Sequence, residues 1–446
     1  MKKLEPTPKI ENSWFIGLAQ AFGNIQDFIT NKDSNIKLFL EKIDSEYYYW
    51  DKIKYKKLVI EDSTKNGIEV WKLVKFCRQT QYKKVAFSTH TFNLNITNYL
   101  QQKLHEFDRG FGNILSEGSL NSPENQKQYL FNSVIEESIT SSQIEGAITT
   151  RQVAKEMIEK NRNPRDNSER MIANNYQTIN YISKIRKEKL TPEKLLEIHT
   201  LITHDTLDKP EQEGNFRISN DVNIVDAITG EIYHSPPSFD LLPQFVDELC
   251  AFFNNENDHF FIHPIVKASI IHFLIGYYHP FADGNGRTAR ALFYWYMLRQ
   301  GYWLTEYLSI SKIILDSRSQ YYRAFQYVEA DENDLTYFVQ YHVKALEKAY
   351  QALVEYLQEK PKKNRQLIDY QKDSNINERQ AQLLIWLNEN PDAVFTVKEI
   401  ENRLAVTNQT ARTDLLGLVE KGLLEKILVN KKEQRFIKPD SQPKNG

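Results

Sequence analysis

Cysteine is almost absent from this sequence. Only Cys77 and Cys250 occur in 446 residues, so we expect neither a disulfide framework nor a cysteine-ligated zinc site. Long apolar runs are missing too, because the most apolar stretch, residues 270–278, is about half as long as a membrane span. The amino terminus is charged and lacks the apolar segment of a secretory signal. These absences predict a cytoplasmic protein with no membrane segment.

Neither sign of charge dominates the chain. Its net charge is -2, which gives no overall attraction to nucleic acid or to an anionic membrane. Hydrophobic residues make up 41% and charged residues 26%, and this balance is typical of a folded protein rather than a disordered one. A chain of this length is expected to form two or three domains.

The spacing of apolar residues predicts a mainly α fold. Residues 125–355 repeat apolar side chains at intervals of three and four, which indicates packed helices. Residues 214–237 interrupt this pattern with short apolar runs around Thr229-Gly230, and two prolines end them, which predicts a small β-hairpin. In the first part of the chain the signals are weaker, with helices expected at residues 15–22 and 70–76.

These patterns divide the chain into four predicted parts. A helix is expected to end near residue 359, and the charged stretch around Pro361 is typical of a linker. The predicted parts are a support domain at 1–120, an all-helical core at 121–359, a linker at 360–375 and a small module at 376–446.

The segment with the most chemical content is a loop between two largely apolar helices. His263-Pro264 opens the first helix, because proline is tolerated in a first turn, and a helix rich in alanine, leucine and aromatic residues follows the loop. The connecting sequence is His279-Pro280-Phe281-Ala282-Asp283-Gly284-Asn285-Gly286-Arg287-Thr288-Ala289-Arg290.

The glycines of this loop predict a site for an anion. Gly284 and Gly286 flank Asn285, so the backbone can turn sharply and present successive N–H groups. Those groups begin the second helix, where the helix dipole favours phosphate. Arg287 and Arg290 are three residues apart, on one helical face, and both can bind phosphate oxygens.

Two other side chains add chemistry to the anion site. Asp283 offers a hard oxygen ligand of the kind that Mg²⁺ takes beside phosphates, and His279 can act as a base near neutral pH. Each feature alone is common in turns and on helix surfaces. Together, twelve residues provide a base, a metal ligand, an anion cradle and two guanidinium groups.

This segment resembles the signature of the Fic family, His-x-Phe-x-(Asp/Glu)-Gly-Asn-Gly-Arg-x-x-Arg, and matches it at every specified position. The resemblance extends over roughly residues 125–350. Within it, residues 214–217 and the hairpin after them are similar to the family's target-binding flap, which places Ile232 and Tyr233 against the target. Residues 317–322 are similar to the stretch near the adenine, and Tyr321 is the predicted base contact.

The resemblance implies an all-helical core that transfers AMP from ATP to a Ser, Thr or Tyr hydroxyl of a target protein. His279 would take the hydroxyl proton, and Asp283 would hold the Mg²⁺ with which pyrophosphate leaves. Arg290 would hold the γ-phosphate. The phosphates would be positioned by Gly284, Asn285, Gly286 and Arg287.

A second motif, Ser141-Ser142-Gln143-Ile144-Glu145-Gly146, resembles the inhibitory motif (Ser/Thr)-x-x-x-Glu-(Gly/Asn) of some Fic proteins. Ser141 and Glu145 are one helical turn apart and face the same way, and Gly146 is typical of a helix end. A carboxylate paired with Arg290 would remove the group that the γ-phosphate needs. The resemblance therefore predicts autoinhibition by Glu145, released by Glu145→Gly with increased self-modification.

The carboxy-terminal module has the pattern of a winged helix-turn-helix. A helix at residues 379–387 precedes a short helix capped by Thr396, and a further helix is expected at residues 409–421, followed by a hairpin around residues 430–432. Such modules bind DNA through the second helix of the motif. Basic and acidic residues nearly balance here, so a protein-contact or dimerisation role is an equal alternative.

Two other functions remain open at this point. The same loop could use another phosphate-containing donor or remove AMP, with Glu145 assisting. The chain could instead be a transcription regulator whose core only senses nucleotide, although sensing would not need His279. The sequence specifies neither the target protein nor whether the chain forms a homodimer.

Overall fold

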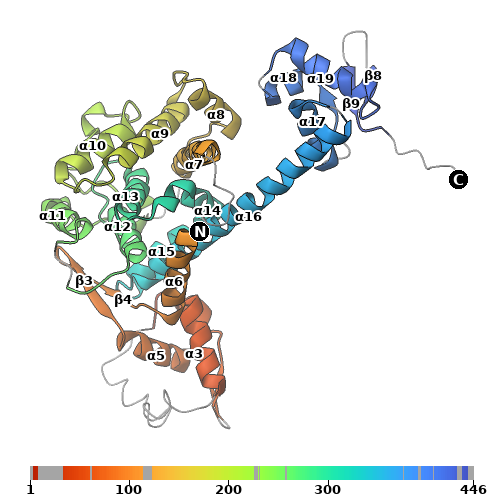
Figure 1. The fold of residues 1–446 in the computed structure, drawn as a ribbon. Helices are drawn as coiled ribbons and strands as arrows, with labels where there is room; N and C mark the ends of the chain where they lie inside the picture. The colour runs from red at the N-terminus through yellow and green to blue at the C-terminus, as the bar shows by residue number, and fades with distance from the viewer. Residues whose placement is uncertain are drawn as a thin grey trace. The chain divides into compact units, whose positions relative to one another are not determined.

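Helices dominate the described part of the chain, and strands pair only in small sheets (Figure 1). This computed structural model describes residues 4–8, 34–60, 63–113, 123–225, 230, 232–256, 259–374, 376–389, 393–404, 406–428 and 434–439. The chain forms two compact units, Met1–Leu353 and Val354–Gly446. The predicted mainly α fold class is confirmed. Among the described helices, none combines the length and the apolar content needed to cross a bilayer.

The first part of unit 1 combines short helices with two β-hairpins. Its elements are α3 (Ser34–Glu46), α4 (Trp50–Ile53), β1 (Leu58–Ile60), β2 (Ser63–Lys65), α5 (Gly67–Gln79), β3 (Lys83–Phe87), β4 (His90–Leu94) and α6 (Asn98–Asn113). The strands β1 and β2 pair antiparallel, as do β3 and β4. The helix predicted at residues 70–76 lies within α5, whereas residues 15–22 are outside the described residues.

Buried charged groups join this first part to the helical core. Lys75 Nζ of α5 lies 2.8 Å from Asp331 Oδ1, and both side chains are 2% exposed. Arg78 of α5 donates to the Tyr337 hydroxyl at 2.7 Å. Because a buried charge is costly without a partner, these contacts fix α5 against the core. The first part therefore shares one compact unit with the core, and the boundary at residue 120 stays a prediction.

The core consists of helices packed around a central helical hairpin. Its helices are α7 (Pro123–Ile144), α8 (Arg151–Glu159), α9 (Asn167–Ile185), α10 (Pro192–Thr203), α11 (Leu242–Phe253), α12 (Pro264–Tyr278), α13 (Asn285–Arg299), α14 (Ile310–Asp316), α15 (Arg318–Ala330) and α16 (Thr336–Ser374), with 3-10 turns η1 (Pro210–Gln212), η2 (Phe239–Leu241) and η3 (Trp303–Tyr307). The hairpin is α12 and α13, and α13 also packs against α7, α9 and α10. Both hairpin helices are buried on nearly every side, as expected of helices that are apolar all round. The hairpin thereby provides a rigid base for the loop that joins its two helices.

The predicted β-hairpin is present in part. β5 (Ile224–Val225) pairs antiparallel with β6 (Ile232–His234), with a register shift between its two residues. Of the two residues at its expected turn, Gly230 is described and has a φ of 68°, whereas Thr229 lies outside the described residues. The strands stand between α10 and α11 in the chain, as the sequence pattern indicates.

Helix α16 runs further than the sequence predicts. It was expected to end near residue 359, but it continues to Ser374, so residues 360–374 are helical rather than an irregular linker. Proline removes one backbone hydrogen bond and can kink a helix without ending it, and here the helix passes Pro361. The boundaries at residues 359 and 375 stay predictions, while the compact units divide within α16, after Leu353.

Unit 2 continues with three helices and a three-stranded sheet. Its elements are α17 (Glu378–Glu389), β7 (Phe395–Thr396), α18 (Val397–Leu404), α19 (Asn408–Glu420), β8 (Glu425–Leu428) and β9 (Gln434–Ile437), with sheet order β7-β9-β8. The Thr396 hydroxyl accepts from Glu399 N at 3.2 Å, as predicted for the cap of α18. The antiparallel pair β8 and β9 forms the predicted hairpin. Strand β7 was not predicted, because it is only two residues long.

Candidate functional site

The loop between α12 and α13 is held by side chains on both of its flanks. Asn285 Oδ1 accepts from Phe281 N at 3.0 Å, and Asn285 Nδ2 donates to the Phe281 carbonyl at 2.9 Å. The fully buried Phe281 ring stacks on His199 of α10 with centroids 3.7 Å apart. Asn285 was predicted to position phosphates; its side chain makes two hydrogen bonds to the Phe281 backbone, and its role toward phosphate stays a prediction.

His199 fastens the other side of the loop. Its Nδ1 accepts from Gly214 N at 3.1 Å, so Nε2 carries the proton and donates to the Asp283 carbonyl at 2.9 Å. Burial lowers the pKa of His199 to about 4, which keeps this neutral tautomer near pH 7. Gly284, which follows Asp283 in the loop, has a φ of 80°, and a Cβ there would lie 2.7 Å from Thr203 Cγ2. Only glycine fits this position.

His279 is oriented by the helix that it ends. Its φ is 47°, in the left-handed region, and its N–H donates to the Ile275 carbonyl at 3.0 Å. Its Nδ1 lies 3.0 Å from the Gly276 carbonyl oxygen. A carbonyl only accepts, so Nδ1 carries the proton and Nε2 keeps its lone pair. Burial lowers the pKa of His279, although the Gly276 carbonyl opposes this effect. The imidazole is therefore a neutral base near pH 7.

Arg290, one turn into α13, is bound by the end of α7. Its Nε donates to Ser141 Oγ at 2.8 Å, and its Nη2 donates to the Ser141 carbonyl at 3.0 Å and to Glu145 Oε1 at 2.8 Å. Burial disfavours the charged Glu145, but Arg290 outweighs it and the pKa of Glu145 is lowered. The two segments that the sequence singled out thus meet, although about 145 residues separate them.

The Glu145 carboxylate also lies directly over the first turn of α13. A Cβ added at Gly286 would lie 2.2 Å from Glu145 Oε1 and 3.2 Å from Arg290 Nη1. The carboxylate therefore lies close to Gly286, at the start of the helix where the glycines predicted an anion site, and helix N-termini favour negative charge. Two buried guanidine nitrogens of α13, Arg290 Nη1 and Arg287 Nε, have no hydrogen-bond partner among the described residues.

The two loop arginines reach different neighbours. Arg287 is 1% exposed, and its Nη1 donates to the Ile202 carbonyl of α10 at 3.0 Å. Its Nη2 lies 3.7 Å from Asp283 Oδ2. Arg287 and Arg290 were predicted to bind phosphate from one helical face. In the structure one nitrogen of Arg287 donates to α10, and two nitrogens of Arg290 donate to groups at the end of α7.

A cavity of about 270 Å³ opens beside the loop. The loop, Glu145, the flap strands and α15 supply its walls, and its lining includes His279, Asp283, Gly286, Tyr233, Tyr321, Tyr322 and Glu329. Tyr321, the predicted base contact, is 5% exposed, and its hydroxyl lies 2.9 Å from His272 Nε2. The neighbouring Tyr322 is more exposed, and the sequence reasoning passed it over.

Asp283 suits the metal role that the loop implies. Its side chain is 62% exposed and lines the cavity, and Oδ1 accepts from its neighbour Gly284 N at 2.6 Å. A single accessible carboxylate beside an anion cradle is how Mg²⁺ is commonly held with a nucleotide, because the phosphates and water supply the other ligands. The donor set therefore fits Mg²⁺ bound together with phosphate.

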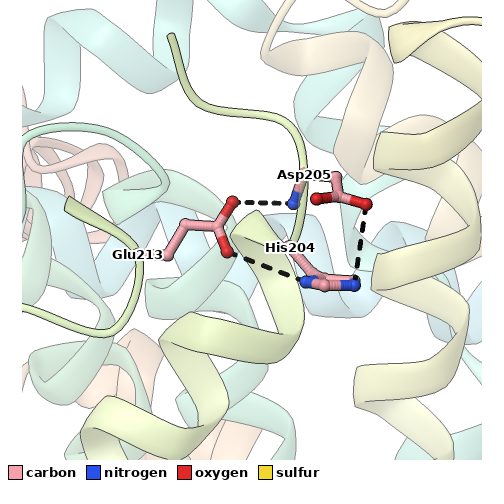
Figure 2. Close-up of side chains that lie close together, drawn as sticks. All are labelled: His204, Asp205 and Glu213. Carbon is pink, nitrogen blue, oxygen red and sulfur yellow. Dashed lines mark hydrogen bonds and ion pairs between the residues drawn. The ribbon is translucent and has the colours of Figure 1, made fainter. Parts of the chain in front are cut away.

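A separate group of acidic and histidine side chains follows α10. Figure 2 shows the His204 imidazole between two carboxylates, with Asp205 Oδ2 3.7 Å from Nε2 and Glu213 Oε2 3.7 Å from Nδ1. One metal ion cannot bind both nitrogens of one imidazole, and Arg170 Nη1 already lies 3.4 Å from Asp205 Oδ2. The group is therefore arranged as a surface ion-pair cluster rather than as a convergent set of metal ligands.

Arg217 connects the predicted flap to the loop between α12 and α13. Its guanidinium donates to the His279 carbonyl at 2.8 Å and to the Tyr278 carbonyl at 3.3 Å, and its N–H donates to the Pro280 carbonyl at 2.9 Å. Ile232 is 56% exposed on β6, and Tyr233 lines the cavity. Of the two predicted flap residues, Tyr233 therefore borders the cavity, whereas Ile232 is exposed on β6 and is not part of its lining.

Sequence reasoning missed the roles of His199 and His234. His234 of β6 has Nε2 2.7 Å from the Tyr277 carbonyl and Nδ1 2.9 Å from Glu329 Oε1 of α15. Neither histidine belongs to a recognisable spacing, because their partners come from distant elements. A polar side chain among apolar residues of α10 was the one signal for His199.

Residues 189–297 match the model of the Fic/DOC family, and residues 379–428 match that of the DeoR-like helix-turn-helix domain. The chain therefore contains a Fic domain, and a DeoR-like helix-turn-helix domain follows it. The predicted helix-turn-helix fold of the carboxy-terminal module is confirmed, while its bounds at residues 376–446 stay a prediction.

Curated relatives and a solved structure agree with this assignment. Protein adenylyltransferase Fic of Drosophila mojavensis is 28% identical over 196 residues, 44% of this chain and 35% of that protein. Its Drosophila melanogaster counterpart is 29% identical over 203 residues, 45% of this chain and 37% of that protein. The chain thus spans little more than a third of the length of these relatives. A Fic-1 variant from C. elegans is similar in fold, with a TM-score of 0.52 at 16% identity, covering 79% of this chain and 94% of that one.

Proposed function

We propose that this chain is a protein adenylyltransferase that moves AMP from ATP to a Ser, Thr or Tyr hydroxyl, and that Glu145 inhibits it. One observation carries the proposal: the Glu145 carboxylate lies over Gly286 at the start of α13, paired with Arg290. An acidic group of the chain itself thus occupies a site suited to phosphate. Arg290 Nη1 and Arg287 Nε, which have no hydrogen-bond partner in the described part of the chain, support the same assignment.

The chemistry follows from the atoms around this site. The oxygen of the target hydroxyl attacks the α-phosphorus of ATP, its proton passes to His279 Nε2, and the bond to pyrophosphate breaks. The products are pyrophosphate and the AMP ester of the side chain. The N–H groups of α13 and Arg290 hold the phosphates in place, and such positioning supplies much of the catalysis in phosphoryl transfer. Mg²⁺ held by Asp283 and phosphate oxygens would neutralise charge on the pyrophosphate.

Labelled nucleotide tests the proposal directly. The purified chain is incubated with candidate target proteins and ATP labelled on either the α- or the γ-phosphate, and the proteins are then analysed by mass spectrometry. Transfer of the α label together with the mass of AMP supports the proposal, and the target includes the chain itself if it is self-modified. Transfer of the γ label, or of neither, contradicts it. Loss of AMP from pre-modified target would favour the reverse activity.

The exposed flap supports a way of binding the target. We propose that an extended target segment pairs with the edge of β6 through backbone hydrogen bonds. Ile232→Pro removes one backbone N–H from that edge, so we expect at least a several-fold rise in the KM for protein target and little change in ATP affinity, measured by steady-state kinetics and calorimetry. The matched Ile232→Ala keeps the N–H and should behave nearly as wild type. Equal loss of target and ATP binding would contradict the flap assignment.

The exposed face of α19 supports a second candidate function for the carboxy-terminal unit. Gln409, Arg412 and Thr413 are exposed on this helix, and glutamine and arginine are side chains that read adenine and guanine. We propose that α19 binds DNA. Selection from a pool of random duplexes should enrich a sequence, and Arg412→Ala should weaken discrimination at one base pair by about 1–3 kcal/mol. No enrichment with the full chain would favour a protein-contact role.

A further inference from the structure

The contact between Glu145 and Arg290 is one of a series of polar contacts between α7 and α13. Glu137, Ser141 and Glu145 recur at intervals of four residues, so they share one face of the helix and its end. Glu137 Oε2 accepts from the Tyr294 hydroxyl at 2.8 Å, and Ser141 and Glu145 bind Arg290. Tyr294 and Arg290 are also four residues apart. This spacing places Glu137 two helical turns from Glu145, away from the cavity.

The Glu137 side chain of this series is held by several hydrogen bonds. Its carboxylate is buried, with the residue 4% exposed, and it accepts from Ser309 Oγ at 2.9 Å and from Ser311 N at 3.1 Å. The Ser311 hydroxyl also donates to it. With the Tyr294 hydroxyl, four donors converge on one carboxylate. Such charge-assisted bonds are strong, and removing one partner of a buried set is costly.

The donors connect α7 to a segment that also holds its other end. Ser309 and Ser311 stand at the start of α14, and Arg318, at the start of α15, donates from Nη2 to the Ile144 carbonyl at 2.7 Å. Residues 309–318 therefore contact α7 at Glu137 and again beside Glu145. A hydrogen bond of 2.8 Å is lost when its partners separate by roughly 1 Å, so a small shift of α7 along its axis would free Arg290.

We propose that Glu137 is a positioning residue for the inhibitory glutamate. Its bonds to α13 and α14 fix α7 along its axis and keep the Glu145 carboxylate on Gly286 and Arg290. This inference rests on the proposed inhibition by Glu145. It adds that inhibition can be relieved from a site outside the nucleotide cavity, through the segment at residues 309–318.

The test uses Glu137→Gln in the full chain, because glutamine keeps the shape and loses the charge. We expect ATP affinity, by calorimetry, and AMP incorporation, from α-labelled ATP, to rise roughly threefold to tenfold, since the hydrogen bonds to Glu137 lose their charge assistance. Glu136→Gln is the matched control: it is the neighbouring glutamate and pairs with Arg151 at 2.5 Å near the surface, so it should leave both quantities unchanged. Ser311→Ala removes one donor, the hydroxyl, without touching the charge and should act in the same direction.

A double variant separates positioning from a general effect on the fold. In the Glu145→Gly background, Glu137→Gln should add no further increase, because no inhibitory carboxylate remains to be displaced. If Glu145→Gly increases ATP affinity but neither Glu137→Gln nor Ser311→Ala does, the positioning role is wrong and the proposed inhibition stands. If Glu137→Gln lowers activity in both backgrounds, Glu137 supports α13 instead. If Glu137→Gln fails to fold by thermal melting, the Ser311→Ala result decides. If Glu145→Gly itself changes nothing, both proposals fall.

Discussion

Replacing His279 with alanine is expected to reduce AMP transfer by roughly 10²–10⁴-fold, while ATP affinity changes little. The reason is that His279 Nδ1 is bound to the Gly276 carbonyl, so Nε2 is the available base, and its loss affects only the step in which the hydroxyl proton leaves. Transfer from α-labelled ATP and calorimetric ATP binding measure the two quantities. His204→Ala is the control, because that imidazole is 65% exposed in the surface ion-pair cluster. Transfer at the wild-type rate by the His279→Ala variant would rule out His279 as the base.

The dependence on pH gives the same histidine a second test. Burial lowers the pKa of His279 below its ordinary value of 6.5. The neutral base therefore persists above that lowered pKa, and kcat/KM should fall only as pH drops through it. Glu145 acts to raise the pKa of His279, so Glu145→Gly should move the fall to a still lower pH. A profile that falls above pH 6.5 would point to a different base.

Replacing Glu145 with glycine is expected to increase AMP transfer by roughly tenfold to over a hundredfold. The Glu145–Arg290 bond is charge-assisted, and such bonds contribute about 1.5–3 kcal/mol. Its loss frees Arg290 and uncovers Gly286 for phosphate. Incorporation of α-labelled AMP, including self-modification, measures the gain as a function of ATP concentration.

The double variant Glu145→Gly, Arg290→Ala should lose this gain, because the inhibitory carboxylate and the phosphate share one guanidinium group. Glu156→Gly is a suitable control, since Glu156 lies on α8 and pairs with surface Lys160. If Glu145→Gly lowers transfer or leaves it unchanged, inhibition is the wrong role. Removal of AMP from a pre-modified target, assisted by Glu145, would then be the better hypothesis.

The loop could be predicted because its parts are contiguous. Glycine spacing and the two arginines indicated an anion site, and the structure places an anionic side chain there. The pairing of Glu145 with Arg290 crosses about 145 residues, so no spacing predicts it, and only the resemblance to a known motif did. The helices and the hairpin followed from apolar periodicity and turn residues, and the flap assignment came from the resemblance.

The side chains that shape the loop were harder to predict. The resemblance implied that Asn285 positions phosphate, but no sequence pattern predicted that its side chain also binds the backbone of Phe281. His199 and Arg217 bind backbone carbonyl groups of the loop. Every residue has such a group, so the sequence does not indicate which carbonyl is bound. Arg287 was expected to lie beside Arg290, but one nitrogen of its guanidinium group donates to the Ile202 carbonyl of α10. Each of these contacts depends on packing between distant helices.

The Glu145–Arg290 contact has a consequence for how the proposed enzyme would respond to its surroundings. The competing carboxylate is tethered to the arginine it occupies, so its effective concentration is set by the chain and is unaffected by dilution. Such a competitor is overcome by raising the concentration of ATP, and the inhibition then takes the form of an increased apparent KM for ATP. Activity would consequently follow the nucleotide level of the surroundings, with a threshold fixed by the stability of one helix end.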